Sequence, residues 1–242
     1  MSPNGFTFDK ANFKILIKEK ALFNWSGGKD SSLALYKLQQ SQEFEIACLL
    51  TSISQKYQRI SMHGVRSELL EMQAKNIGIP LVKMEIPDMP SMEVYEKTMR
   101  ETLSELKREG ITASIFGDIF LEDLRTYRET KLAELDLKGI FPLWKQPTKN
   151  LIREFLDLGF KTITTCVNEK FLDKSFVGRV IDEDFLKDLI NMHNLQIEPD
   201  KLIRNNFIIE PYNQYYLNSN INDWSEKHAI NKPFTLTPTG KQ

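Results

Sequence analysis

A glycine- and serine-rich segment, Ser26–Ser32 (SGGKDSS), carries the residue types that bind phosphate. The apolar run 21–25 precedes it and the helical pattern 33–38 follows it, which predicts a strand, a glycine turn and a helix N-terminus. The first turn of a helix has backbone N–H groups without partners, and the helix dipole favours an anion there. Two adjacent glycines let the backbone approach a ligand closely. The segment therefore predicts a phosphate-binding loop, to which Lys29 adds a positive charge.

Asp30 lies inside this loop and needs a separate explanation. A carboxylate beside bound phosphates repels them unless a cation lies between. Asp30 could stabilise the helix start through the dipole, or hold Mg²⁺ that bridges the phosphates, because hard cations take carboxylate and phosphate oxygens. The two roles are compatible. The loop is not the common P-loop, which requires four residues between its first glycine and Gly-Lys-Ser/Thr.

Strands and helices alternate along the chain up to about residue 167. Apolar runs predict strands at 20–25, 45–53, 81–86, 113–116, 140–144 and 161–167. Helical patterns predict helices at 29–40, 65–77, 91–110, 121–137 and 148–159, with caps at Ser91 and Thr148. This alternation indicates a doubly wound, mainly parallel α/β sheet of the Rossmann type with helices on both faces, followed by a small C-terminal region.

A second glycine turn is expected at the same edge of this sheet. Gly117 and Asp118 follow the strand at 113–116, just as the phosphate-binding loop follows the strand at 20–25. Ligands in such sheets bind at the carboxyl ends of the strands, where the strand order reverses. If the two strands are neighbours, the two turns face each other across one crevice. A site role for Asp118 competes with a simple turn-capping role.

The composition is that of an ordinary globular chain. The 242 residues are 41% hydrophobic and 27% charged, with a net charge of −1, which favours no general nucleic-acid-binding surface. No apolar run reaches the ~20 residues that span a membrane, and the N-terminus lacks the apolar core of a signal peptide. Cys48 and Cys166 lie far apart in apolar runs, which predicts buried thiols in a reducing compartment. We expect a cytoplasmic protein, and homo-oligomerisation is left open.

Two regions are expected along the chain. Residues 1–168 would form the domain that contains the phosphate-binding loop, and residues 169–242 would form a separate C-terminal region. From Asn191 onward asparagine is frequent, and no helical or strand period is sustained. The C-terminal region is therefore expected to be partly disordered after residue 190.

The phosphate-binding loop resembles the PP-loop of ATP pyrophosphatases, enzymes that cleave ATP between its α and β phosphates. Later segments fit one branch of that superfamily, which is adenine nucleotide alpha hydrolase-like. They are Phe116-Gly117-Asp118-Ile119, Arg125 with Glu129, Pro142-Leu143-Trp144, and Val177-Gly178-Arg179. Their order is typical of diphthine–ammonia ligases and their bacterial relatives, and the resemblance covers residues from about 20 to about 185.

The resemblance implies an ATP-dependent, AMP-forming amide ligase that activates a carboxylate by adenylation for attack by ammonia. Its expected partners are ATP, Mg²⁺, ammonia and a carboxylate acceptor, either a small molecule or a protein side chain. The implied ATP-binding residues are Ser26, Gly27, Gly28, Lys29, Asp30, Ser31, Thr51, Ser52 and Gly117. The implied catalytic residues are Lys29, Asp30 and Asp118, with Asp30 as the Mg²⁺ ligand. The implied acceptor-side residues are His63, Arg125, Glu129, Trp144 and Arg179. The resemblance thus makes residues 1–168 a nucleotide-binding domain and residues 169–242 an acceptor-side region.

The chain departs from the family pattern after Arg179. The family usually continues with a cysteine-containing motif that begins Gly-Glu, but Ile190–Leu195 follows here and no Gly-Glu pair occurs later. Two alternatives therefore stay open: a tRNA-modifying PP-loop enzyme and a non-catalytic adenine-nucleotide-binding protein. The acceptor-side residues also have structural interpretations, with His63 in a plain loop, Arg125 and Glu129 on a solvated helix face, and Trp144 in the core.

Overall fold

The computed structural model describes residues 18–60, 65–167, 172–193 and 208–212. Six strands form the main sheet: β1 (Glu19–Asn24), β2 (Phe44–Ser54), β3 (Arg59–Ile60), β4 (Leu81–Ile86), β5 (Ala113–Ile115) and β6 (Lys138–Ile140). The path β3-β2-β1-β5-β6 is hydrogen-bonded in that order, and β4 also pairs with β2. All pairs are parallel except β2 with β3. The predicted doubly wound, mainly parallel sheet is confirmed.

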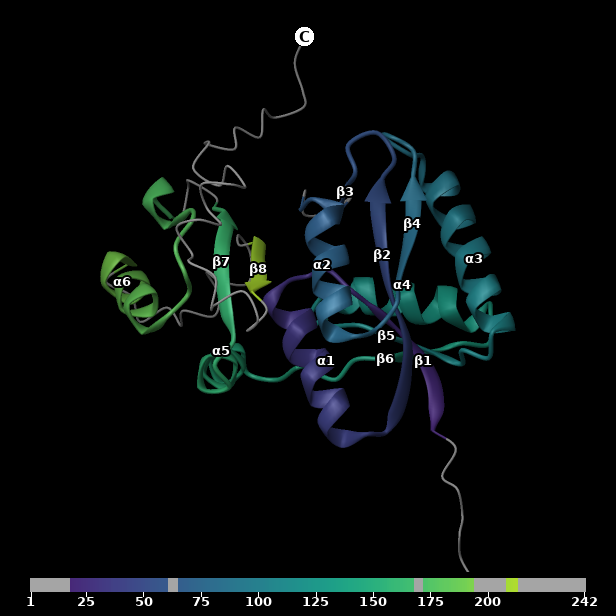
Figure 1. Ribbon diagram of the computed structural model, residues 1–242, viewed down its shortest axis with the longest axis horizontal. Helices are drawn as coiled ribbons and strands as arrows, with labels where there is room; N and C mark the ends of the chain where they lie inside the picture. Colours follow the sequence, from purple (N-terminus) through teal and green to yellow (C-terminus); the bar gives the residue numbers. More distant parts are fainter. Residues whose placement is uncertain (1–17, 61–64, 168–171, 194–207, 213–242) are drawn as a thin grey trace, which may run out of the picture.

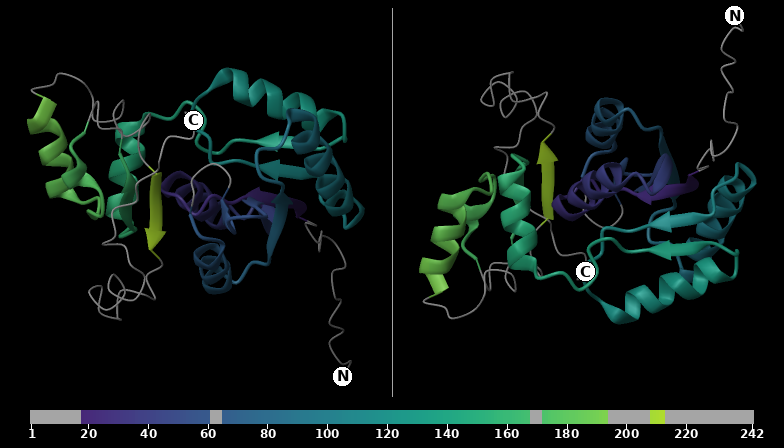
Figure 2. Two further views of the ribbon diagram at one scale, coloured as in Figure 1. Left: turned by 90° about the horizontal axis from the view of Figure 1, so that it is seen from above. Right: turned by 90° about the horizontal axis from the view of Figure 1, so that it is seen from below.

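Helices cover both faces of this sheet (Figure 1). One face carries α1 (Lys29–Ser41) and α2 (Ser67–Ile77), and the other carries α3 (Met92–Arg108) and α4 (Glu122–Ala133). Figure 2 shows the strands between these two helical layers. The central strand β1 is buried on both sides, because Phe23 packs into the core with α1 and α2 whereas Leu22 packs into the core with α3 and α4. This explains why its sequence is a continuous apolar run.

Most predicted elements lie within a few residues of the observed ones. The strand at 81–86 and the Ser91 cap are confirmed, since the Ser91 hydroxyl accepts a hydrogen bond from the amide of Val94. The expected Thr148 cap is wrong, because Thr148 is the first residue of α5 (Thr148–Asp157) and Pro147 precedes the helix without a side-chain cap.

The predicted short strand at 140–144, expected to break into a loop, is misplaced, because only Ile140 of that range lies in a strand. The strand is β6, which lies earlier in the chain and pairs with β5 through residues 138–140. Residues 142–145 form a turn instead, since Pro142 has no N–H to donate to a sheet and the Trp144 amide bonds to the Phe141 carbonyl. In addition, the short strand β3 lies between the predicted strand at 45–53 and the predicted helix at 65–77, where no strand was expected.

The C-terminal region, here the described residues from 161 onward, lies beside α1, away from the main sheet (Figure 1). It contains β7 (Lys161–Cys166), the 3₁₀ helix η1 (Lys174–Phe176), α6 (Glu183–His193) and β8 (Ile208–Tyr212). The expectation that residues 161–167 continue the parallel sheet is wrong, because β7 pairs antiparallel with β8 in a separate sheet. The preceding helix α5 holds this region on α1, where Lys37 Nζ lies 2.6 Å from a Glu154 carboxylate oxygen.

Several expectations fall wholly or partly outside the described residues. Disorder after residue 190 is one, because only residues 191–193 and 208–212 of that stretch are described. The Cys166 side chain is another, whereas Cys48 is confirmed as a buried free thiol whose pKa burial raises to about 11. The boundary at residue 168 remains a prediction. None of the helices in the described ranges combines the length and apolar character needed to cross a bilayer.

Phe23 offers a direct test of this core. Its side chain is fully buried on the central strand. We expect Phe23→Ala to lower the free energy of unfolding by about 3–5 kcal/mol, through lost burial and the cavity left behind. Met89→Ala is the control, because Met89 is 89% exposed and its truncation should change stability by less than about 0.5 kcal/mol. Urea unfolding of both variants measures this, and equal effects would contradict the assignment of Phe23 to the core.

Candidate functional site

The two glycine turns leave from neighbouring strands. β1 and β5 pair in parallel with Phe23 opposite Ile115, so both strands end at the same edge of the sheet. The Asn24 side-chain amide strengthens this junction, since it donates to the Ser114 hydroxyl and to the Ile115 carbonyl, each at 2.9 Å. The predicted adjacency of the phosphate-binding loop and the Gly117-Asp118 turn is therefore confirmed.

Gly117 contacts the backbone of the phosphate-binding loop. A Cβ atom at Gly117 would lie 2.9 Å from the Ser31 Cα and 3.0 Å from the Ser31 amide nitrogen. Real Cβ atoms do not tolerate such distances to backbone, so a side chain there would push the two turns apart. Glycine is required at this position for close approach, and its φ is not in the left-handed region.

The loop presents an uncapped helix N-terminus. Gly28 occupies the N-cap position, and no side chain caps the first turn of α1. The hydroxyls of Ser31 and Ser32 instead donate back to the Gly28 carbonyl, each at 3.0 Å. Ser26 accepts from the Gly28 amide at 3.2 Å, and its hydroxyl lies 3.0 Å from that of Ser31. The first-turn amides of α1 are thus available to an anion.

Two ion pairs lie at the two glycine turns. The buried ammonium of Lys29 pairs with Asp30, and Arg128 pairs with Asp118. Burial raises the pKa of Asp118, Arg128 opposes this by its charge and hydrogen bond, and the nearby Asp30 carboxylate raises the pKa further. The two cations and two carboxylates have no net charge, and each carboxylate has a cation as its partner.

Three of the predicted acceptor-side residues come together next to these charges. The Arg125 guanidinium lies 4.7 Å from the ring centroids of both Phe141 and Trp144, and its Nε donates to Glu129 at 2.8 Å. Trp144 is thus a partly exposed wall of this cluster, and the solvated-face interpretation of Arg125 is not what the contacts show. Cation–π contacts of this kind fix a guanidinium in place.

Two further residues connect this cluster to Asp118. Phe116 stacks on Phe141 with ring centroids 5.2 Å apart, and Arg128 lies 4.3 Å from the Phe116 centroid. Neither Phe116 nor Arg128 is among the site residues predicted from the sequence. The available signal was their spacing, because Phe116 directly precedes Gly117 and Arg128 follows Arg125 by one helical turn.

Two of the remaining predicted residues, Thr51 and Ser52, lie on β2. Thr51 is 3% exposed, and its hydroxyl has no hydrogen-bond partner within the described ranges; Ser52 follows it on β2. Both lie just before the end of β2 and beyond the end of β1, since the Trp25 amide bonds to the Leu50 carbonyl. His63 lies outside the described residues.

Arg179 is not brought together with the other predicted residues. Its guanidinium lies 2.7 Å from the Asp188 carboxylate and stacks over the rings of Phe176 and Phe185. These contacts among the described residues all belong to the C-terminal region. An acceptor role for Arg179 therefore stays a prediction without geometric support.

The residues of the loop fit a nucleotide with a divalent cation. Asp30 keeps 41% of its side chain exposed and could present a carboxylate oxygen to Mg²⁺. Within the described ranges no group of three or more histidine, cysteine, aspartate or glutamate residues could hold a metal alone. A bound Mg²⁺ would therefore depend on phosphate oxygens as well as on Asp30.

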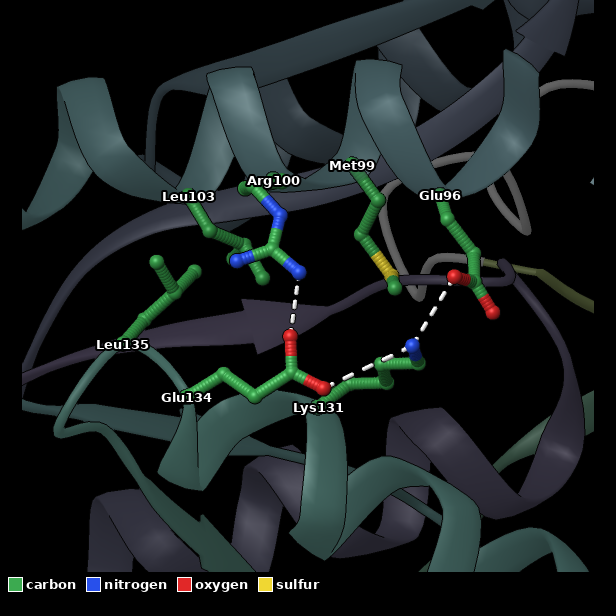
Figure 3. A pocket seen from close by; sticks show the side chains of 7 residues that line it. All are labelled: Glu96, Met99, Arg100, Leu103, Lys131, Glu134 and Leu135. Atoms are coloured by element: carbon green, nitrogen blue, oxygen red, sulfur yellow. Dashed lines mark hydrogen bonds and ion pairs between the residues drawn. The ribbon is translucent and has the colours of Figure 1, made fainter. Parts of the chain in front are cut away.

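A small hollow between α3 and α4 is distinct from this crevice (Figure 3). Its floor is apolar and its charges are paired, with Lys131 Nζ 2.8 Å from Glu96, 3.5 Å from Glu134, and Arg100 also paired with Glu134. The lining residues are Glu96, Met99, Arg100, Leu103, Lys131, Glu134 and Leu135. This network offers a ligand no uncompensated charge, and we assign it a role in holding α4 against α3.

Comparison with known proteins agrees with the geometry. The profile of the diphthamide synthase N-terminal domain matches residues 19–139, and that of the diphthamide synthase C-terminal domain matches residues 147–199. The chain belongs to the diphthamide synthase family. The N-terminal domain of the family thus contains both glycine turns together with Arg125 and Glu129, and the predicted PP-loop resemblance is confirmed.

Other comparisons add little to this assignment. No curated protein matches the chain. Among solved structures, the U34-tRNA thiolase NcsA from Methanococcus maripaludis with its 4Fe-4S cluster is similar at 17% sequence identity and a TM-score of 0.31. That alignment covers 91% of this chain and 69% of the thiolase chain.

The Asp118–Arg128 pair of this diphthamide synthase family member can be tested by titration. Arg128 lowers the pKa of Asp118 against the raising effect of burial, so Arg128→Met should raise that pKa further. Because the folded-state pKa already exceeds the unfolded value, stability is full below the unfolded pKa and is partly lost as pH rises through the folded pKa. Arg128→Met should therefore increase the loss of folding stability between acidic and neutral pH.

Carboxyl carbon NMR measures the Asp118 pKa, and urea unfolding across acidic and neutral pH measures the stability. Arg100→Met is the matched control, because Arg100 on α3 pairs with Glu134 at the C-terminal end of α4 and not with Asp118. An Asp118 pKa that responds equally to both variants would show that the pair does not exist in solution.

Proposed function

We propose that this protein is an ATP-dependent, AMP-forming amide ligase that joins ammonia to a carboxylate acceptor. The observation that carries the proposal is the uncapped start of α1, held in direct backbone contact with the Gly117-Asp118 turn. Membership of the diphthamide synthase family supports the use of ATP by this loop. The acceptor would bind near Arg125, Glu129 and Trp144. The stacked rings of Phe141 and Phe116 and then Arg128 connect this cluster to Asp118.

The chemistry requires activation of the acceptor. A carboxylate does not react with ammonia near neutral pH, because hydroxide is a poor leaving group. In the proposed first step an acceptor carboxylate oxygen attacks the α phosphorus of ATP, and the bond to pyrophosphate breaks. In the second step the ammonia nitrogen attacks the acyl carbon, AMP leaves with the bonding electrons, and the nitrogen loses a proton to give the amide.

The protein would contribute chiefly positioning and electrostatic stabilisation. The Lys29 ammonium and the first-turn amides of α1 would bind phosphate oxygens, and Asp30 would hold Mg²⁺ against them. Lys29 and Asp30 pair with each other when no ligand separates them, so binding would exchange this pair for contacts with phosphate and Mg²⁺. Asp118 would face the same crevice from the other turn, where Arg128 keeps a cation beside it.

Product analysis tests the proposal. The full chain is incubated with ATP, Mg²⁺, ammonium and a panel of carboxylate acceptors that includes small molecules and proteins. We expect AMP, pyrophosphate and an amide in equal amounts. ADP and orthophosphate as the products would refute an AMP-forming ligase.

A non-catalytic nucleotide-binding protein is the second candidate, favoured by the absence of a Gly-Glu pair anywhere after Arg179. Calorimetric ATP binding without AMP formation across the whole panel would support it. A tRNA acceptor in the same panel distinguishes the tRNA-modifying alternative, which would consume ATP only when tRNA is present.

Lys29→Ala provides the variant test of the loop. The buried ammonium beside the helix N-terminus should contribute about 1.5–3 kcal/mol to phosphate binding, so its loss should weaken ATP affinity about 10- to 100-fold. Lys37→Ala is the matched control on the same helix, because Lys37 pairs with Glu154 on α5 and not with a residue of the loop. Calorimetry with Mg-ATP measures both, and unchanged affinity in Lys29→Ala would contradict the proposed phosphate site.

A further inference from the structure

Helix α2 braces the phosphate-binding loop on the side opposite Gly117. The Gln73 side chain accepts a hydrogen bond from the Trp25 indole nitrogen at 3.1 Å and donates one to the Gly27 carbonyl at 3.4 Å. The fit is tight, since a Cβ atom at Gly27 would lie 2.7 Å from Gln73 Oε1 and 2.9 Å from Leu70 Cδ2. Gly27 also has a φ of +71°, which only glycine adopts readily.

The indole fixes which way the Gln73 amide points. An indole nitrogen can only donate a hydrogen bond, so the Gln73 atom that faces Trp25 must be the carbonyl oxygen Oε1. The amide nitrogen Nε2 is then the atom that faces Gly27, and it can only donate. The group of Gly27 that faces Gln73 must therefore be a hydrogen-bond acceptor, and it is the Gly27 backbone carbonyl.

The orientation of that carbonyl determines the orientation of the next amide. In a trans peptide the carbonyl of one residue and the N–H of the next point in opposite directions. With the Gly27 carbonyl directed at α2, the Gly28 N–H points into the loop, where it meets the Ser26 hydroxyl. A peptide between two glycines can flip at low steric cost, because neither residue has a Cβ atom. A flipped peptide would direct a carbonyl oxygen toward the phosphate site and repel an anion.

We propose that Gln73 is a positioning residue that holds the Gly27–Gly28 peptide in the orientation that accepts phosphate. It does so without touching the nucleotide. The role rests on the proposed nucleotide binding by the loop. It places a determinant of ATP affinity on α2, outside the glycine–serine segment, and makes the indole of Trp25 part of the same arrangement.

Three variants test this role. Gln73→Leu removes both hydrogen bonds while keeping an apolar side chain against Gly27, and should weaken Mg-ATP affinity about fivefold, the equivalent of one ordinary hydrogen bond. Gln73→Glu keeps an acceptor for Trp25 but sets a carboxylate beside the Gly27 carbonyl, and should weaken affinity by about tenfold or more. Trp25→Phe frees the Gln73 amide to rotate and should weaken affinity less than Gln73→Glu. Glu71→Gln on the same helix is the control, because Glu71 pairs with Lys83 on β4.

NMR of the nucleotide-free protein gives a readout that a merely structural role would not change. We expect the Gly28 amide resonance to split or broaden in both Gln73 variants, as the peptide samples two orientations, and to stay unchanged in Glu71→Gln. An unchanged Gly28 resonance together with unchanged ATP affinity in folded Gln73→Leu would overturn the proposal while leaving nucleotide binding intact. If the unmodified protein bound no ATP, the proposed function itself would fail. A fall in melting temperature alone, with affinity and the Gly28 resonance unaltered, would likewise overturn the positioning role.

Discussion

The site depends on a backbone-to-backbone contact between two glycine turns. Gly117 approaches the Ser31 backbone so closely that no side chain fits between them, and the parallel pairing of β1 with β5 makes this approach possible. On its other side the loop meets α2, again through a glycine, Gly27. The phosphate-binding loop is thus packed against two neighbours, with no room for a Cβ atom at Gly27 or at Gly117. Since protein interiors are close-packed, such a loop has little freedom to adjust when a neighbour changes.

Charge pairing is the second constraint on this crevice. Lys29 pairs with Asp30 and Arg128 pairs with Asp118; Lys29 is buried, Arg128 and Asp118 are partly buried, and Asp30 is more exposed. A buried charge without a partner is costly, so each carboxylate keeps a cation nearby. Both arginines of α4 also lie over aromatic rings, Arg125 over Phe141 and Arg128 over Phe116. The predicted acceptor-side residues and the predicted catalytic residue Asp118 are therefore connected by one continuous set of contacts.

The loop, the Gly117-Asp118 turn and most elements could be predicted from the sequence because each is encoded locally. Glycines, a basic residue and serines in one short segment define a phosphate-binding turn, and apolar runs define buried strands. The role of Gln73 could not be predicted, because a single glutamine on an amphipathic helix has no local signature and its partners are about fifty residues away in sequence. The position of β6 was missed because Ile140–Trp144 is apolar enough for a strand, yet Pro142 cannot join one. The pairing of β7 with β8 was missed because register between distant strands is set by tertiary contacts.

The junction at Asn24 has a consequence for how the protein becomes active during its synthesis. Its amide bridges to residues 90 and 91 positions later in the chain, so the two walls of the crevice are distant in sequence. Contacts of such long range form only after the intervening loop has been closed, at an entropic cost. A nascent chain that has exposed the first strand and the glycine–serine segment therefore has the sequence of a phosphate site but not its geometry. The proposed nucleotide recognition would thus be acquired only when β5 docks against β1, so that ligand binding would report the pairing of these two strands.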